Sequence, residues 1–144
     1  MKSLLAGLAM TAVSLWGTFS FAQQQPRYPV DPQTKWAVGA KPKPADELKK
    51  QLDSGSTVLI IDVRPTANFE KETIPGAINI PLAELEVHLK TMPKDTFIVF
   101  TRGTGGLSSQ AAKLAEELGF QNTTFCPVSK WKEQGYQAEP GKKK

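Results

Sequence analysis

Residues 101–106 form a short glycine-rich segment that could bind an anion. An apolar run at residues 97–101 predicts a strand before it, and apolar spacing at residues 107–118 predicts a helix after it. A loop ahead of a helix N-terminus directs backbone N–H groups into a shared hollow, which favours negative charge. The guanidinium of Arg102 would add a forked donor. The candidate binding residues are Arg102, Gly103, Thr104, Gly105, Gly106 and Ser108.

The same residues also have structural interpretations. Arg102 could pair with a carboxylate, and the glycines could merely turn the chain. Ser108 or Ser109 is expected to cap the helix rather than to take part in catalysis, because a serine oxygen accepts hydrogen bonds from first-turn N–H groups.

The loop lacks a reactive thiol. A cysteine at its start would have a lowered pKa and would be nucleophilic. The predicted strand ends instead in Thr101 and Arg102, and neither carries sulfur. A threonine hydroxyl with no adjacent base is a weak nucleophile, so we assign no catalytic residue to the loop.

Cys126 is the only cysteine, and it ends a predicted strand at residues 122–126. It could lie near the loop and serve as an alternative nucleophile or a redox-active thiol. The other interpretation is a small buried apolar residue, which is favoured because nothing in the sequence indicates a lowered pKa. One cysteine and one histidine, His88, argue against an intramolecular disulfide and a zinc site, and no cofactor is indicated. We expect His88 to be exposed.

The N-terminal residues 1–22 are typical of a secretory signal peptide. Lys2 precedes a mostly apolar run, and Ser20-Phe21-Ala22 gives a small-x-small pattern, so cleavage is predicted after Ala22. An uncleaved membrane anchor is the alternative, but the run is shorter than the ~20 residues that a spanning helix needs. The sequence therefore predicts a secreted, periplasmic protein with no stable membrane anchor after cleavage.

The remaining chain has 144 − 22 = 122 residues, enough for one domain. Loss of Lys2 lowers the formal net charge from +4 to +3. Basic residues alternate with acidic ones and show no aromatic interleaving, so no nucleic-acid partner is expected. Residues 140–144 are expected to form a solvated, frayed basic tail.

Residues 23–43 are rich in glutamine and proline and are interpreted as a linker, extended or disordered unless it docks on the domain. Within it, Trp36-Ala37-Val38 could form a docked edge strand, because an exposed tryptophan would be poorly placed.

Strands and helices alternate beyond this linker. Helices are expected at residues 44–52, 82–92, 107–118 and 129–134, and strands at 58–63, 77–81, 97–101 and 122–126. Such alternation predicts an α/β fold with a largely parallel sheet and helices on both faces. Ligands of these sheets bind beyond the carboxyl ends of the strands, where the 101–106 loop lies.

Several motifs resemble those of the rhodanese-homology family. They are Ile61-Asp62-Val63-Arg64, Phe69, residues 74–82, Val99-Phe100, residues 110–114, Gly119-Phe120, Trp131-Lys132 and Gly135-Tyr136. The resemblance covers residues 40–139 and implies a three-layer domain at about 44–139. In active members a loop cysteine carries sulfane sulfur as a persulfide and transfers it to a thiophilic acceptor.

The chain departs from this pattern around the expected pocket. Alignment from the strand places Thr101 at the family's cysteine, and alignment from the helix places Arg102 there. Glu72 and Thr73 stand where the family usually has Gly-His, and Cys126-Pro127 replaces a usual Gly-Gly. Outside the loop, Asp62 and Arg64 are expected to form a structural ion pair, and Phe69 and Trp131 to anchor the core.

These observations predict an exported rhodanese-like domain without sulfurtransferase activity that binds a small anion or an exported protein partner. The alternative is a sulfurtransferase or redox-active thiol protein that uses Cys126. A third hypothesis is a pure interaction module that binds through the Trp36 segment or the basic tail.

Overall fold

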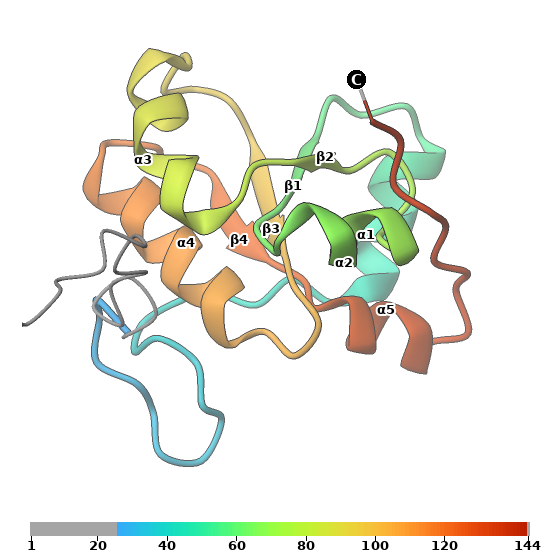
Figure 1. Ribbon diagram of the computed structural model, residues 1–144, viewed down its shortest axis with the longest axis horizontal. Coiled ribbons are helices and arrows are strands. Elements are labelled where there is room, and N and C mark those ends of the chain that lie inside the picture. The colour runs from blue at the N-terminus through green and yellow to red at the C-terminus, as the bar shows by residue number, and fades with distance from the viewer. Residues whose placement is uncertain (1–25, 144) are drawn as a thin grey trace, which may run out of the picture.

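The computed structural model describes residues 26–143 as an α/β domain built on a four-stranded sheet (Figure 1). The predicted signal peptide at residues 1–22 and its cleavage site after Ala22 lie outside the described residues. The elements are α1 (Ala45–Asp53), β1 (Leu59–Asp62), α2 (Thr66–Lys71), β2 (Ile78–Asn79), α3 (Leu82–Thr91), β3 (Ile98–Thr101), α4 (Gly106–Glu117), β4 (Thr123–Phe125) and α5 (Val128–Glu133).

The sheet has the order β2-β1-β3-β4, and every neighbouring pair is parallel. This arrangement confirms the predicted α/β fold with a parallel sheet. Asp62 pairs in register with Thr101, so β1 and β3 end at the same level. The carboxyl ends of β1, β3 and β4 therefore meet at one edge, where a ligand site is expected.

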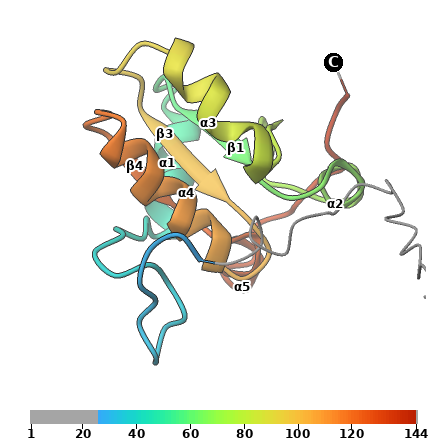
Figure 2. The same cartoon turned by 60° about the vertical axis from the view of Figure 1, so that its left-hand side comes forward.

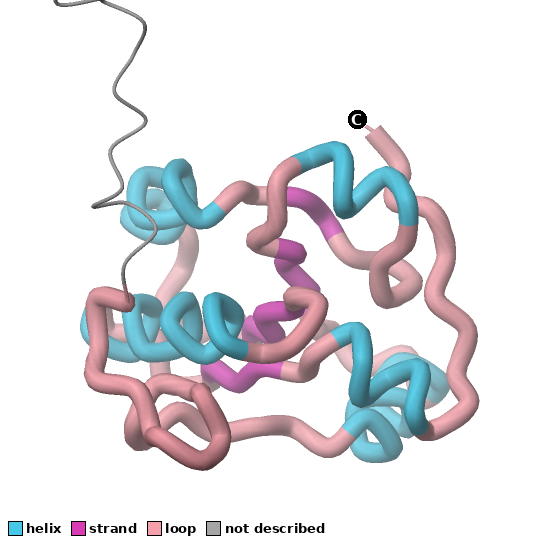
Figure 3. The backbone as a smooth tube through the Cα atoms, turned by 60° about the horizontal axis from the view of Figure 1, so that its bottom comes forward, coloured by secondary structure: helices cyan, strands magenta, loops and turns pink. Residues whose placement is uncertain are grey.

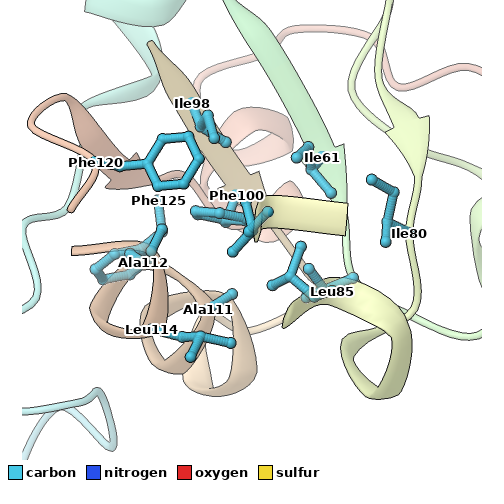
Figure 4. Close-up of a cluster of buried hydrophobic side chains, with 13 residues drawn as sticks. Ile61, Ile80, Leu85, Ile98, Phe100, Ala111, Ala112, Leu114, Phe120 and Phe125 are labelled. Atoms are coloured by element: carbon cyan, nitrogen blue, oxygen red, sulfur yellow. The ribbon is translucent and has the colours of Figure 1, made fainter. Parts of the chain in front are cut away.

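Two clusters of buried side chains fill the space between the sheet and the helices on its two faces. Figure 3 shows the strands lying between helices. On one face, Leu85 and Leu89 of α3 and Ala111 of α4 belong to one buried cluster with Phe100 of β3. Figure 2 shows α3 and α4 on the same side of the sheet, and Figure 4 shows Leu85, Ala111 and Phe100 of this cluster. The opposite cluster contains Ala45, Leu48, Ile60, Ile74, Val99, Cys126, Val128 and Trp131, with α1 and α5 as its helices. Helices on both faces match the prediction.

A helix at Thr66–Lys71 was not among the predicted elements. Its six residues are too few for a clear apolar stripe, and a single buried side chain, Phe69, anchors it. One signal could have found it: a proline stands directly before four helices of the described chain, at Pro44, Pro65, Pro81 and Pro127. Phe69 and Trp131 are each 2% exposed, as expected of core anchors.

The segment before α1 packs on the domain, and Figures 1 and 2 show it beside α4. Gln110 Oε1 accepts a hydrogen bond from the Tyr28 N–H at 2.7 Å, and Gln110 Nε2 donates to the Tyr28 carbonyl at 2.9 Å. Ser109 Oγ accepts from the Ala37 N–H at 2.8 Å. The prediction of an edge strand at Trp36–Val38 is wrong, however. Ala37 pairs locally with Val30 in an isolated antiparallel bridge, so this stretch adds no strand to the sheet.

The described part of the C-terminal tail, residues 140–143, is mostly exposed, as expected, but it contacts the domain and so is not frayed as predicted. Glu139 and Thr73 exchange two backbone hydrogen bonds of 2.7 and 2.9 Å. The Gly141 N–H donates to the Phe69 carbonyl at 2.9 Å, and Lys143 Nζ lies 2.9 Å from Glu70. These contacts join the tail to α2 at least as far as Lys143.

Candidate functional site

The loop between β3 and α4 consists of residues 102–105 and lies at the carboxyl edge of the sheet. Gly105 is the N-cap of α4 with a φ of 90°, and the helix begins at Gly106. The prediction that Ser108 or Ser109 caps this helix is wrong. Both side chains lie within the first turn and donate backwards, Ser108 Oγ to the Gly105 carbonyl (3.1 Å) and Ser109 Oγ to the Gly106 carbonyl (2.6 Å).

Three of the four carbonyls of the loop accept hydrogen bonds from backbone N–H groups of helices. The Arg102 and Gly103 carbonyls accept hydrogen bonds of 2.8 and 3.1 Å from the N–H groups of Val128 and Ser129 in α5. The Gly105 carbonyl accepts from the Ser109 N–H at 3.0 Å. Meanwhile, the N–H groups of residues 103–108 have no protein acceptor within the described chain. The loop therefore offers donors to a ligand.

Arg102 is half-buried and forms no ion pair with any carboxylate of residues 26–143. The expected alternative, in which Arg102 pairs with a carboxylate, is therefore not seen. Burial, followed by the nearby Arg64 guanidinium, lowers the pKa of Arg102, and Asp62 partly offsets both effects. Arginine stays protonated even so, which leaves a cation without a carboxylate partner in the described chain at the start of the loop.

Asp62 and Arg64 form the predicted ion pair, with Arg64 Nη2 lying 2.7 Å from Asp62 Oδ2. The carboxylate also accepts from Arg64 Nε at 3.0 Å and from the Thr73 hydroxyl at 2.8 Å. Arg64 donates to the Glu72 carbonyl as well. Asp62 is completely buried, so these donors replace its hydration shell. Sequence reasoning missed the role of Thr73, because eleven residues separate it from Asp62.

Thr101 is also fully buried, and its hydroxyl has no hydrogen-bond partner in the described structure. Its register with Asp62 places the two side chains on the same face of the sheet. A buried hydroxyl without a partner is uncommon in native proteins and calls for an explanation. Thr101 does not line the cavity beside the loop.

A cavity of about 450 Å³ opens beside the loop at this edge. It is lined by Arg64, Glu72, Gly103, Val128, Ser129, Lys132 and Glu133. Both of its glutamates are paired, because Glu72 lies 2.9 Å from Lys132 and Glu133 lies 2.8 Å from Lys130. Of the predicted binding residues, Gly103 lines this cavity, together with Arg64 and the start of α5, whereas Arg102, Thr104, Gly105, Gly106 and Ser108 do not.

Cys126 belongs to the buried cluster below α1 and α5 and is completely inaccessible. Burial raises the pKa of its thiol from 9.0 to about 11, and Lys43 offsets this only in part. This is the environment of an inert structural cysteine rather than of a nucleophile. His88 is exposed, as predicted.

We expect Cys126 to resist alkylation by iodoacetamide in the folded protein. A pKa of about 11 in place of 9.0 lowers the thiolate fraction near neutral pH by roughly a hundredfold. Mass spectrometry of the native protein and of the urea-unfolded protein would compare the two rates. Labelling of Cys126 at equal rates in both states would contradict the prediction.

Within residues 26–143, no helix is long and apolar enough to cross a membrane, and no group of three or more histidine, cysteine or acidic side chains could hold a metal ion.

A family model described as a rhodanese-like domain matches residues 44–127. The human thiosulfate:glutathione sulfurtransferase is 35% identical over 97 residues, which cover 58% of this chain and 84% of that protein. Three other curated relatives are longer, and the chain spans 41%, 33% and 17% of their lengths.

Solved structures give the same result. The human single-domain sulfurtransferase TSTD1 aligns with a TM-score of 0.57 and 32% identity, over 67% of this chain and 98% of that one. The Alr3790 protein from Anabaena aligns with a TM-score of 0.61 and 27% identity, over 67% of this chain and 90% of that one.

Proposed function

The chain belongs to the rhodanese-like domain family, and from that premise we propose that it is a binding member which holds a small oxyanion at the 102–105 loop and lacks sulfurtransferase activity. The observation that carries the proposal is Arg102, a half-buried cation without a carboxylate partner in residues 26–143. It is the first residue of a loop whose N–H groups at residues 103–105 have no acceptor in the described chain. Charge-assisted hydrogen bonds from such donors are the strongest available for an oxyanion.

Two features support the absence of sulfur transfer. Neither Thr101 nor Arg102, the two positions that match the family's cysteine, can carry a persulfide. The remaining thiol, that of Cys126, is buried and has a raised pKa. Relatives of this chain are named as sulfurtransferases, so sulfur transfer is the activity that we propose this chain lacks.

The proposal includes export to the periplasm. Its support is the sequence of residues 1–22, with a basic start, a short apolar run and a small-x-small motif before Gln23. N-terminal sequencing of the protein isolated from a periplasmic extract would test it, with Gln23 as the expected first residue.

We expect sulfate or thiosulfate to raise the melting temperature of the protein that begins at Gln23, because a ligand that binds only the folded state stabilises it. Arg102→Gln should weaken binding about ten- to a hundredfold, the usual range for losing hydrogen bonds to a charged group. Thermal unfolding measures the change in melting temperature and calorimetric titration measures the affinity, both at constant ionic strength with chloride as the reference anion.

Arg27→Gln is the matched control, because it removes the same charge from an exposed arginine that pairs with Glu86. It should leave anion affinity unchanged. Equal affinity of the Arg102→Gln variant and the original protein would contradict the site.

A separate assay tests the absence of turnover. Purified protein with thiosulfate and cyanide should form no thiocyanate above the blank. Turnover that Cys126→Ser abolishes would instead support the alternative enzyme that uses this thiol.

A further inference from the structure

Residues 26–38, which we call the strap, lie along one face of α4 (Figures 1 and 2). Close contacts with the strap run from the N-cap of the helix to its last residue, at Gly105, Ser109, Gln110 and Glu117. Positions four and seven residues apart share a face of a helix. The match to the family model begins at residue 44, so the strap precedes the matched domain.

Backbone groups of the strap bond to polar side chains of α4. Tyr28 donates its N–H to Gln110 Oε1 at 2.7 Å, and its carbonyl accepts from Gln110 Nε2 at 2.9 Å. The Ala37 N–H donates to Ser109 Oγ at 2.8 Å. Ser109 and Gln110 are buried although they are polar. In water these side chains find other partners, so release of the strap costs less free energy than exposure of apolar core.

Gly39 separates the strap from a segment that is fixed to the sheet. The Lys43 N–H donates to the Phe125 carbonyl at 2.8 Å, and the Phe125 N–H donates to the Lys41 carbonyl at 3.3 Å. Gly39 has a φ of 78°, which glycine adopts at no steric cost, and Val38 beside it is 56% exposed. A small residue in a turn between two held segments is typical of a hinge.

The strap is also closed on itself by hydrogen bonds. The Asp31 N–H donates to the Trp36 carbonyl at 2.8 Å, and the Val38 N–H donates to the Pro29 carbonyl at 2.8 Å. The Asp31 carboxylate accepts from the Thr34 N–H at 2.7 Å. All of these bonds lie within the strap, so rotation at the hinge does not break them.

We propose that the strap is a hinged cover, which undocks from α4 as a unit about Gly39 while the sheet and helices stay folded. In the docked state Trp36 Nε1 lies 2.7 Å from the place of a Cβ added at Gly105. Undocking withdraws the indole from the N-cap of α4, so the position of the strap sets the surroundings of the 102–105 loop. The inference goes beyond the proposed oxyanion binding and does not depend on it.

Native-state hydrogen exchange, followed by NMR on the protein that begins at Gln23, tests the proposal. The amides of Tyr28 and Ala37 bond to α4, whereas that of Lys43 bonds to β4. We expect the first two to have equal protection factors, at least about tenfold below that of Lys43, because local opening costs less than global unfolding. Equal protection of all three amides would overturn the proposal, because the strap would then open only when the domain unfolds. Unrelated protection of Tyr28 and Ala37 would also overturn it, because the strap would then not open as a unit.

Gln110→Ala removes both hydrogen bonds to the Tyr28 backbone. It should lower the protection of Tyr28 and Ala37 together by at least about tenfold, because two hydrogen bonds are lost, and leave that of Lys43 unchanged. Glu116→Ala serves as the comparison, since Glu116 is an exposed residue of the same helix whose side chain forms no hydrogen bond with residues 26–38. It should change none of the three. A loss confined to Tyr28, or one that extends equally to Lys43, would contradict the hinged cover.

Discussion

Replacing Asp62 by alanine is expected to lower the free energy of unfolding by about 3 to 5 kcal/mol, the usual cost of removing one partner from a buried ion pair. The Asp62 side chain is 0% exposed and that of Arg64 is 11% exposed. Without the carboxylate, the Arg64 guanidinium and the Thr73 hydroxyl would stay buried with fewer acceptors. Urea unfolding followed by circular dichroism measures the change.

Asp53→Ala is the matched control. Asp53 lies 2.5 Å from Lys49, but its side chain is 62% exposed, so water and salt screen the pair. Its loss should cost less than about 1 kcal/mol. Similar costs for Asp62→Ala and Asp53→Ala would show that the buried network contributes little to stability.

The Asp62 network also explains why Arg102 is available to a ligand. Two arginines and one buried carboxylate stand at the carboxyl edge of the sheet, and Arg64 donates to that carboxylate from its backbone nitrogen and from two side-chain nitrogens. Arg102 is therefore left without a carboxylate in the described chain. Because Asp62 pairs with Arg64, two residues further along the chain, it does not pair with Arg102.

Much of this arrangement could be predicted from the sequence, because it depends on local pattern. The apolar run of β1 and β3 predicted buried parallel strands, and the spacing of Leu85 and Leu89 predicted the buried stripe of α3. Asp62 and Arg64 are two residues apart at a strand end, so their pairing was also predictable.

What could not be predicted depends on contacts between distant parts of the chain. Gln110 and Tyr28 are 82 residues apart, and nothing local in either predicts that an amide side chain holds the N-terminal segment. The expected capping of α4 by a serine is not seen, and a contact with a distant residue is again involved. Ser109 accepts the Ala37 N–H, and it lies one turn too far along α4 to cap it.

Two separate features of the structure favour glycine at position 105, the N-cap of α4. Gly105 has a φ of 90°, in the left-handed region that side chains disfavour. In addition, a Cβ added there would lie 2.7 Å from Trp36 Nε1 and 2.9 Å from Pro127 Cγ. Trp36 is itself held by an edge-on contact with Phe125, whose ring centroid is 5.0 Å away.

We therefore expect Gly105→Ala to lower the free energy of unfolding by about 3 to 5 kcal/mol, the sum of backbone strain and overpacking. Gly119→Ala separates the two causes, because Gly119 has a φ of 99° and an added Cβ would meet nothing within 4 Å. That variant should lose about 1 to 2 kcal/mol, from strain alone. Urea denaturation of both variants gives the comparison.

The double variant Trp36→Ala/Gly105→Ala tests whether the N-terminal segment is the obstacle. Removing the indole relieves the 2.7 Å contact but leaves Pro127, so the double variant should lose at least about 1 kcal/mol less than the sum of the single losses. Strict additivity would mean that Trp36 does not press on the loop. A positive coupling would instead link residues 26–43, which precede the matched domain, to the shape of the 102–105 loop. The indole of Trp36 and a side chain at position 105 would then compete for the same space.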